Sequence, residues 1–254
     1  MTSDVFRQSL NDGRPRLLAW STLGNPYFIE LAGKSGWDAV LIDHQHGIGG
    51  MAELSACLMA ARSVQLPALV RVASHDVAAI SRALDDGAQG IMLPMVNSPA
   101  DAQSFVQAVK YPPLGQRSWG PYRGQFLMEI DYQANANSWT IACAQIETRQ
   151  ALDNLDAILA TEGLDMVLVG PNDLSVSLTD GAVRDIREPV VVKALEEILE
   201  KTRAAGKIAG IYANDNDYAK QMIAGGWNFV AAGSETSMLQ QALSETRDQL
   251  SAKN

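Results

Sequence analysis

The sequence predicts an α/β protein, a (β/α)8 TIM barrel with an additional C-terminal helix. Three observations predict this fold class. The 254 residues are enough for one such barrel, short apolar β-rich runs alternate with longer helical patterns, and there are eight of these runs. No linker-like or low-complexity segment divides the chain, so we expect residues 1–254 to form one domain. The alternative is an open doubly wound sheet, but no G-x-G-x-x-G follows the first run.

The predicted strands are short and almost continuously apolar, as strands of a parallel sheet covered on both faces must be. In chain order they are Leu17–Ser21, Ala39–Asp43, Pro67–Arg71, Gly90–Pro94, Thr140–Ile146, Met166–Gly170, Ala209–Tyr212 and Asn228–Ala232.

The helices between them carry ordinary start signals. Proline stands near a first helical turn at Asn25-Pro26, Ser98-Pro99 and Glu188-Pro189. Thr148 and Asn214 are candidate N-caps. These signals place a helix after most of the strands.

Two segments break the alternation. Tyr111–Trp139 shows no clean periodicity, and long connections inside a compact domain are usually functional. Its Arg117 and Arg123 either recognise a substrate carboxylate or brace the loop. Glu235–Leu250 predicts an amphipathic helix, which is either the eighth barrel helix or an oligomerisation element packed on a neighbour.

The composition excludes several classes of protein. A formal charge of −9 without a basic cluster argues against a nucleic-acid partner. The N-terminus has no apolar signal core, and no run approaches the ~18 apolar residues of a membrane span. Cys57 and Cys143 lie far apart, outside any metal-binding spacing, which favours a reducing compartment. We therefore expect a cytoplasmic protein.

Polar residues collect where the predicted strands end. In a (β/α)8 barrel these ends form one face, which carries the active site. The residues concerned are Trp20 and Ser21, Asp43 to His46, Arg71, Gln145 and Glu147, Gly170 to Asp173, and Tyr212 to Asn214. We expect their side chains to converge.

Glu147 and Asp173 follow consecutive strands, so their carboxylates are expected to face each other. Two neighbouring carboxylates repel unless a proton or a cation lies between them. A hard divalent ion takes one or two carboxylates and completes its shell with water and substrate. Alternatively, each residue only complements the dipole of a helix start.

Arg71 ends an apolar run, where an unpaired guanidinium is costly. It either stabilises charge that develops on a substrate oxygen or forms a structural pair with an acidic neighbour such as Asp43.

Asp43 and two histidines lie within four residues, followed by three glycines in residues 47–50. A histidine that an aspartate orients can act as a general base near neutral pH. His46 lies in the loop proper, but the pattern does not separate it from His44. His75 lies near a predicted helix start, where a structural role is favoured.

Two common mechanisms are disfavoured. No lysine ends a predicted strand, so the desolvated lysine of a Schiff-base mechanism is missing. No serine stands in a G-x-S-x-G context, and neither cysteine ends a strand facing the site, which argues against nucleophilic catalysis.

Several motifs together resemble one family. LIDHQHG, LVRV, LDDGAQGIMLPMV, YPPLGQRSWG, QIET and VGPNDLS occur in the order found in the metal-dependent class II pyruvate aldolases of the HpcH/HpaI family, over nearly the whole chain. That family includes the 4-hydroxy-2-oxoheptane-1,7-dioate and 2-dehydro-3-deoxyglucarate aldolases. The resemblance implies a (β/α)8 barrel, usually assembled as a hexamer (a trimer of dimers), with the last helix exchanged between subunits.

The resemblance also implies roles for individual residues. Glu147 and Asp173 match the ligands of a divalent metal ion, Mg²⁺, Mn²⁺ or Co²⁺. His46 matches the family base, with Asp43 as its partner. Arg71 matches the arginine that faces the enolate oxygen.

Further matches concern substrate binding. Gln145 matches a glutamine beside the bound pyruvate, and Trp20 an aromatic wall. The turn Gly170-Pro171-Asn172-Asp173 would offer backbone amides to the pyruvate carboxylate. The chain departs from the family at Gln45, usually glutamate, and at Asn172, usually alanine. Gln45 removes a negative charge beside His46, which bears on the basicity of His46 or on the preferred substrate, and Asn172 bears on the aldehyde preference.

The implied reaction is the reversible aldol addition of a 2-oxo acid enolate to an aldehyde, with cleavage of 4-hydroxy-2-oxo acids as its reverse. Alternatives on the same scaffold are an oxaloacetate decarboxylase and a CoA-ester lyase, since both form such an enolate. A CoA lyase usually needs extra length and basic residues to bind the nucleotide, and the sequence shows neither. A non-catalytic sensor of small acids is a third alternative, although a sensor has no need of a base.

Overall fold

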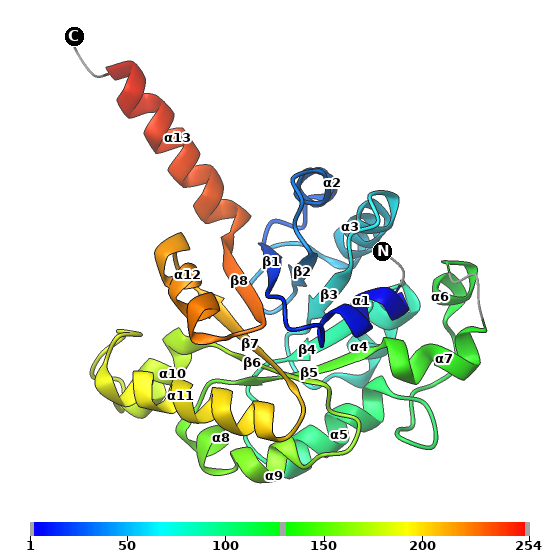
Figure 1. Ribbon diagram of the computed structural model, residues 1–254. Coiled ribbons are helices and arrows are strands. Elements are labelled where there is room, and N and C mark those ends of the chain that lie inside the picture. The colour runs from blue at the N-terminus through cyan, green and yellow to red at the C-terminus, as the bar shows by residue number, and fades with distance from the viewer. Residues whose placement is uncertain (1–2, 128–130, 252–254) are drawn as a thin grey trace.

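The computed structural model describes residues 3–127 and 131–251, which contain a closed barrel of eight parallel strands (Figure 1). Each strand pairs with its neighbours in chain order, and β1 also pairs with β8. The strands are β1 (Arg16–Ser21), β2 (Ala39–Asp43), β3 (Ala68–Arg71), β4 (Gly90–Leu93), β5 (Ile141–Ile146), β6 (Met166–Val169), β7 (Ile208–Ala213) and β8 (Phe229–Ser234). The predicted fold is confirmed, although β8 runs two residues beyond its predicted end.

The helices of the described residues surround the barrel, except that the first closes one end of it and the last extends away from it. They are α1 (Ser3–Ser9), α2 (Pro26–Lys34), α3 (Met51–Ser63), α4 (Val77–Asp85), α5 (Pro99–Val109), α6 (Tyr122–Leu127), α7 (Tyr132–Trp139), α8 (Arg149–Asp153), α9 (Leu155–Leu159), α10 (Pro171–Leu178), α11 (Pro189–Ala204), α12 (Asn216–Gly225) and α13 (Glu235–Ser251).

The predicted helix starts are confirmed at Pro26, Pro99 and Pro189. Thr148 caps α8 by accepting a hydrogen bond from Ala151 N. The predicted cap at Asn214 is wrong by one residue, because the carboxylate of Asp215 accepts from Tyr218 N at 2.7 Å.

The core has two layers. One fills the space between strands and helices, and the other fills the barrel interior with inward side chains such as Leu41, Leu69 and Phe229. Helix α1 closes the N-terminal end of the barrel with Phe6 and Leu10, both at most 2% exposed. Burial of such side chains contributes about 1.5–3 kcal/mol each.

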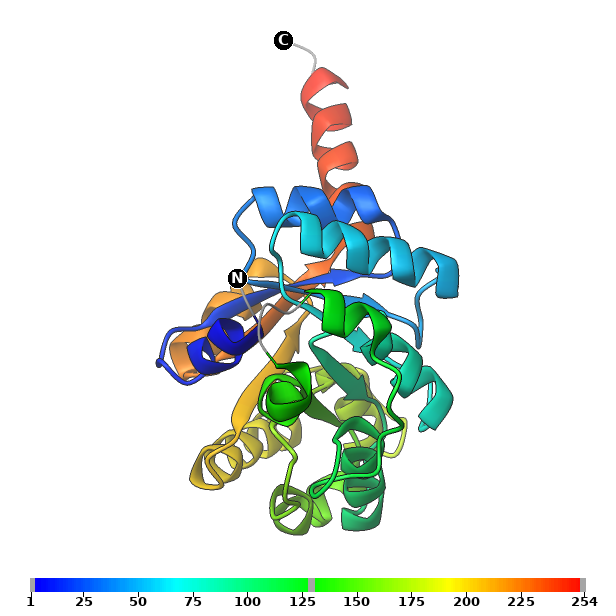
Figure 2. The same ribbon diagram turned by 90° about the vertical axis from the view of Figure 1, so that its right-hand side faces the viewer.

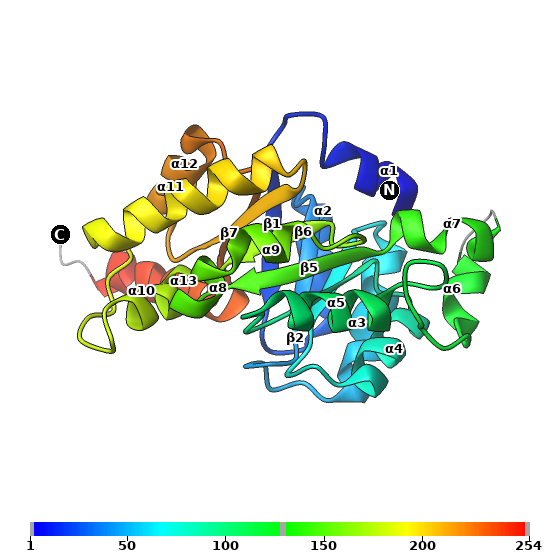
Figure 3. The ribbon, with the colours of Figure 1, turned by 90° about the horizontal axis from the view of Figure 1, so that it is seen from below.

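The connection Tyr111–Trp139, which lacks clean periodicity in the sequence, is partly helical. It contains α6 and α7 and lies with α1 at the opposite end of the barrel from α10 and α13 (Figure 3). Aromatic packing takes the place of apolar periodicity, through Tyr111, Trp119, Tyr132 and Trp139. The buried Arg117 donates to Asp85 at 2.7 Å and to Tyr132 Oη at 3.1 Å. Arg117 therefore braces this connection. Residues 128–130 lie outside the described residues.

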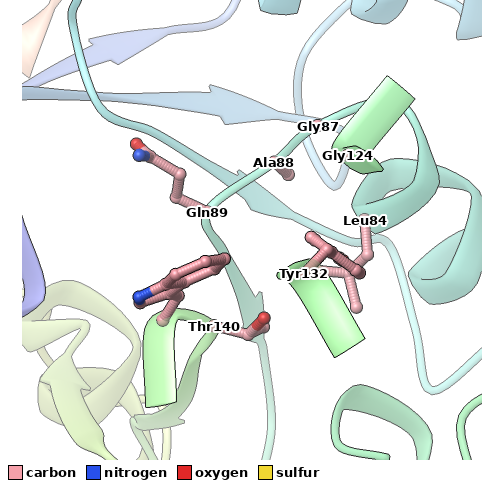
Figure 4. Close-up of a pocket in the computed structure, with 8 residues that line it drawn as sticks. Leu84, Gly87, Ala88, Gln89, Gly124, Tyr132 and Thr140 are labelled. Carbon is pink, nitrogen blue, oxygen red and sulfur yellow. The ribbon is translucent and has the colours of Figure 1, made fainter. Parts of the chain in front are cut away.

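A small cavity lies beside this connection (Figure 4). It is lined by Leu84, Gly87, Ala88, Gln89, Gly124, Tyr132, Trp139 and Thr140. Its volume of about 10 Å³ leaves room for about one water molecule, so no organic ligand fits.

A buried polar network ties this end of the barrel together. Lys110, only 1% exposed, donates to Asp165 Oδ2 and Asn137 O at 2.8 Å each and also to Thr140 O. Arg7 of α1 binds the second carboxylate oxygen of Asp165 at 2.8 Å. Four segments that are distant in the sequence thus meet at one ion-pair network.

The C-terminal helix is formed as predicted, but it does not cover the barrel. Helix α13 extends away from the other elements (Figures 1 and 2). Glu235 is its one buried residue, and Leu239, Leu243 and Leu250 are 54–83% exposed. At these spacings the three leucines lie on one face of the helix.

Within the described ranges, no helix is long and apolar enough to cross a membrane. Cys57 and Cys143 are both free and buried.

Candidate active site

A pocket of about 220 Å³ opens at the C-terminal ends of the strands. Its lining contains the residues to which the family resemblance assigns a role, except Glu147, whose carboxylate lies beside the lining residue Gly170. The lining residues are Trp20, Thr22, Asp43, His46, Arg71, Gln145, Gly170, Pro171, Asn172, Asp173, Tyr212 and Ser234. The predicted convergence is therefore found.

Asp43 and Arg71 form a buried, bidentate ion pair. The guanidinium donates from Nε to Oδ1 at 2.9 Å and from Nη2 to Oδ2 at 2.6 Å. Paired strands β2 and β3 place the two residues opposite each other in the register. Burial acts to raise the pKa of Asp43, but the hydrogen bonds and charge of Arg71 outweigh it and hold the pKa below the usual 3.8. Asp43 is therefore a fixed anion.

The same carboxylate shapes the loop that carries His46. Asp43 Oδ1 accepts from the backbone amides of Gln45 at 2.9 Å and His46 at 3.3 Å. Gly47 has no room for a side chain, because a Cβ there would collide with the Asp43 carbonyl. The expected bond from Asp43 to the His46 imidazole is not among the hydrogen bonds of the described residues, and the carboxylate faces Arg71 instead. Asp43 thus orients the loop and not the ring.

Arg71 keeps one face toward the pocket. Its guanidinium carbon lies 4.8 Å from the centre of the Trp20 ring, and its Nη1 lies 3.4 Å from Gln145 Oε1. The Trp20 indole donates to Asp43 Oδ2 at 3.3 Å. These contacts hold the guanidinium in place before any substrate binds.

Glu147 is 3% exposed and accepts a hydrogen bond from the backbone amide of Met95 at 2.8 Å. Met95 has a φ of +56°, a left-handed conformation that is uncommon for a residue other than glycine. Burial raises the pKa of Glu147 to about 7, the Met95 amide opposes this, and the charge of Asp173 adds to it. The negative charge of Asp173 therefore acts on Glu147, and the positive charge of Arg71 opposes it.

Gly170 makes room for these groups. A Cβ there would lie 2.7 Å from Glu147 Oε2 and 2.8 Å from Gln145 Nε2. Asp173 stands in the first turn of α10, just after this glycine. Within residues 3–127 and 131–251, no cluster of three or more His, Cys, Asp or Glu residues could hold a metal ion. A pair of carboxylates still fits a hard divalent ion that keeps most positions for water and substrate.

Part of the pocket wall consists of residues to which the sequence pattern assigns no role. Tyr212 packs edge-on against Trp20, with ring centres 5.1 Å apart. Thr22 and Ser234 complete this wall. Ser234 was not predicted as a site residue because β8 extends past its predicted end. Thr22 was not predicted because it follows the end of β1 by one residue. Tyr212 ends the predicted strand Ala209–Tyr212, so its position alone could have marked it as a pocket residue.

The side chain of Asn172, in the pocket lining, is paired with that of a residue after β7. Asn172 exchanges two side-chain hydrogen bonds with Asn214, at 2.9 and 3.1 Å. This pairing explains why Asn214 does not cap α12.

Four other candidates do not reach the pocket lining. Arg117 lies at the other end of the barrel, paired with Asp85, and Arg123 lies in α6 at that same end. His75 lines a separate cavity of about 380 Å³, together with Gln45 and Asp101 among others. His44 is half-buried, and burial lowers its pKa despite the nearby charge of Asp43.

The HpcH/HpaI aldolase/citrate lyase family model matches residues 16–242. Hydroxypyruvate/pyruvate aldolase from Rhizorhabdus wittichii is 37% identical over 236 residues, covering 93% of this chain and 94% of the relative. The 2-keto-3-deoxy-L-rhamnonate aldolase of Salmonella gallinarum is 37% identical over 246 residues, covering 96% of this chain and 91% of the relative.

The structural comparison agrees with these matches. A crystal structure of an HpcH/HpaI aldolase/citrate lyase family protein from Burkholderia cenocepacia superposes with a TM-score of 0.90 at 30% identity, covering 98% of this chain and all of that one. The relatives named above are aldolases, which are carbon–carbon lyases. The chain belongs to the HpcH/HpaI aldolase/citrate lyase family.

Proposed function

We propose that the protein is a metal-dependent class II aldolase. It adds the enolate of a pyruvate-type 2-oxo acid to an aldehyde and, in reverse, cleaves 4-hydroxy-2-oxo acids. The observation that carries this proposal is the Glu147–Asp173 carboxylate pair at the edge of a pocket that also holds Arg71 and His46. The names of the two aldolase relatives support it.

Glu147 and Asp173 are the residues that would hold the metal ion. The ion is Mg²⁺ or Mn²⁺, with Co²⁺ as an alternative, since carboxylate oxygen is a hard ligand. When bound, such an ion supplies a Lewis acid for the oxygens of the 2-oxo acid.

Several residues of the chain bind and orient the substrate. Arg71 places positive charge beside the keto oxygen as it becomes an enolate. The turn Gly170-Pro171-Asn172-Asp173 opens α10, where backbone amides favour a carboxylate. Gln145 lies beside the acid, and Trp20 forms the wall that excludes water on one side.

His46 is the proposed base of the cleavage direction. It lies in the pocket lining, on the loop that Asp43 holds. It removes the proton of the substrate 4-hydroxyl, directly or through a water molecule.

Replacing His46 with glutamine is expected to slow aldol cleavage by about 10²–10⁴-fold, the usual contribution of general base catalysis. Decarboxylation of oxaloacetate is expected to change less than about threefold. It reaches the same enolate by loss of CO₂, without deprotonating a hydroxyl group. Both rates are measured on the same metal-loaded preparation. Equal losses in the two reactions would remove His46 from the base role.

The proposed activity itself is tested by hydrogen–deuterium exchange at C3 of pyruvate, followed by NMR with added Mg²⁺ or Mn²⁺ and again after EDTA. Exchange that requires the metal supports the enolate mechanism. If exchange persists in EDTA, the reaction is metal-free and the site assignment fails. If there is none in either condition, pyruvate is not the donor.

We also propose a homohexamer, a trimer of dimers, with α13 exchanged between subunits. The support is the exposed stripe of Leu239, Leu243 and Leu250, which no part of the same chain covers in the described residues. Light scattering is expected to give the mass of a hexamer. The variant Leu239→Glu/Leu243→Glu is expected to give smaller species, whereas Gln240→Glu on the same helix is not. A monomeric parent protein contradicts the proposal.

The remaining proposals concern context. Residues 1–254 act as one aldolase domain. The free cysteines Cys57 and Cys143 fit a cytoplasmic location, and the charge of −9 fits a protein without a nucleic-acid or membrane partner.

A further inference from the structure

Glu235 lies at the junction of β8 and α13 and is 5% exposed. Its carboxylate is held by one tripeptide at the end of β1. Oε1 accepts from Ser21 Oγ at 2.9 Å and from Leu23 N at 2.7 Å. Oε2 accepts from Thr22 N at 2.7 Å and from Thr22 Oγ1 at 3.3 Å. Hydrogen bonds to an ionised acceptor are about twice as strong as neutral ones, so Glu235 fixes this loop firmly.

The tripeptide belongs to the rim of the pocket. It follows Trp20 directly, and Thr22 lines the pocket itself. On its other side, the carbonyl of Thr22 accepts a hydrogen bond from Ile48 N at 2.8 Å. The two loops also touch at glycines, since a Cβ on Gly24 would lie 3.0 Å from Gly49 Cα.

These contacts form a continuous path. It leads from the start of α13 through Glu235 to the loop after β1, and from Thr22 to the loop of residues 44–50 that carries His46. The loop of residues 44–50 is therefore held at two places, by Asp43 from within and by Thr22 from its neighbour.

We infer that Glu235 is a positioning residue for the reaction, which fixes the His46 loop relative to the start of α13. This inference rests on the proposed aldolase function. Glu235 is not among the pocket-lining residues and acts through Thr22 and Leu23. Its effect on rate follows from geometry, because a misplacement of about 1 Å at a reacting group can cost about 10²-fold.

The test uses Glu235→Gln in the full-length, metal-loaded enzyme. Glutamine keeps the size of the side chain but turns an N–H₂ group toward one of the two backbone amides, which needs an acceptor. We expect kcat for aldol cleavage to fall at least about tenfold, with KM for the 4-hydroxy-2-oxo acid within about twofold. Oxaloacetate decarboxylation, which does not use His46, is expected to stay within about threefold. This split distinguishes positioning from a general loss of structure.

Amide hydrogen exchange measured by mass spectrometry gives a second readout. In Glu235→Gln, exchange is expected to accelerate in peptides covering residues 21–24 and 46–49 and to stay unchanged in β5. The matched control is Glu245→Gln, which removes the same charge from the exposed part of α13. This variant is expected to match the parent protein in aldol cleavage, oxaloacetate decarboxylation and amide exchange.

Ser21→Ala supplies a milder variant, because it removes one hydroxyl donor and leaves both amide contacts. It is expected to shift cleavage and loop exchange in the same direction, by about two- to threefold. Parental cleavage in folded Glu235→Gln overturns the inference. If Glu235→Gln does not fold, unchanged loop exchange in Ser21→Ala overturns it. A parent protein that cleaves no 4-hydroxy-2-oxo acid refutes the proposed function instead, and amide exchange still tests whether Glu235 holds the loop after β1.

Discussion

Replacing Glu147 with glutamine is expected to lower metal-dependent proton exchange at C3 of pyruvate by about 10³-fold. This corresponds to roughly 4 kcal/mol, within the several kcal/mol that a Lewis acid contributes to charge stabilisation. Glutamine has the same size and can still accept the hydrogen bond of Met95 N. The substitution therefore removes the charge with little change in packing.

Two measurements check this expectation. NMR follows pyruvate exchange at saturating Mn²⁺, and calorimetry follows Mn²⁺ binding in the absence of substrate. Glu196→Gln, on the exposed face of α11, is the matched control and is expected to behave as the parent protein. Unchanged Mn²⁺ affinity in Glu147→Gln would show that the ion is held elsewhere.

Lys110→Met is expected to cost about 3–5 kcal/mol of unfolding free energy, the usual cost of breaking a buried ion pair from one side. Methionine fills a similar volume but leaves the carbonyls of Asn137 and Thr140 without this donor. Asp165 keeps its bond to Arg7, which places the loss in that range and not above it.

Urea unfolding followed by circular dichroism measures the change. Lys201→Met is the control, because Lys201 pairs with Asp156 and Glu197 on the surface and its loss is expected to cost less than about 1 kcal/mol. The aldolase activity of folded Lys110→Met is expected to remain, since the network lies at the end of the barrel away from the pocket. A cost equal to that of Lys201→Met would show that the network adds no stability beyond that of a surface pair.

The barrel was predictable because the strands are continuous apolar runs, and polar residues follow several of them directly. That pattern placed Asp43, Arg71 and Glu147 at one rim without any structure. It worked because parallel strands all end on the same side, so order along the chain becomes proximity in space.

Other features leave no periodic signal. Helices α6 and α7 are short. The buried residues of α7, Tyr132, Ala136 and Trp139, span too few turns for their periodicity to stand out, and α6 exposes its aromatic residues. The left-handed φ of Met95 is a tertiary effect, unexpected for methionine. Glu235 reads as the start of a helix, and its partners lie more than 200 residues earlier in the chain.

The structure gives Asp43 a different partner from the one that its neighbours in the sequence suggest. Asp43 and His46 are close in sequence, which suggests a pair. The register of β2 against β3 instead sets Arg71 opposite Asp43, and a guanidinium with two donors competes successfully for the carboxylate. Residues that face each other on adjacent strands are far apart in the sequence, so a short motif does not reveal such a contact.

The separation of the Lys110 network from the pocket has a consequence for changing the enzyme. Sites that are far apart and share no partners usually contribute to stability additively, within about 0.3–0.5 kcal/mol. Gains made around Lys110 and Asp165 could therefore offset losses caused by new side chains at Tyr212 or Asn172. Active-site substitutions often lower the free energy of unfolding. Stabilising changes far from the pocket would therefore help to preserve the fold while the aldehyde preference is altered.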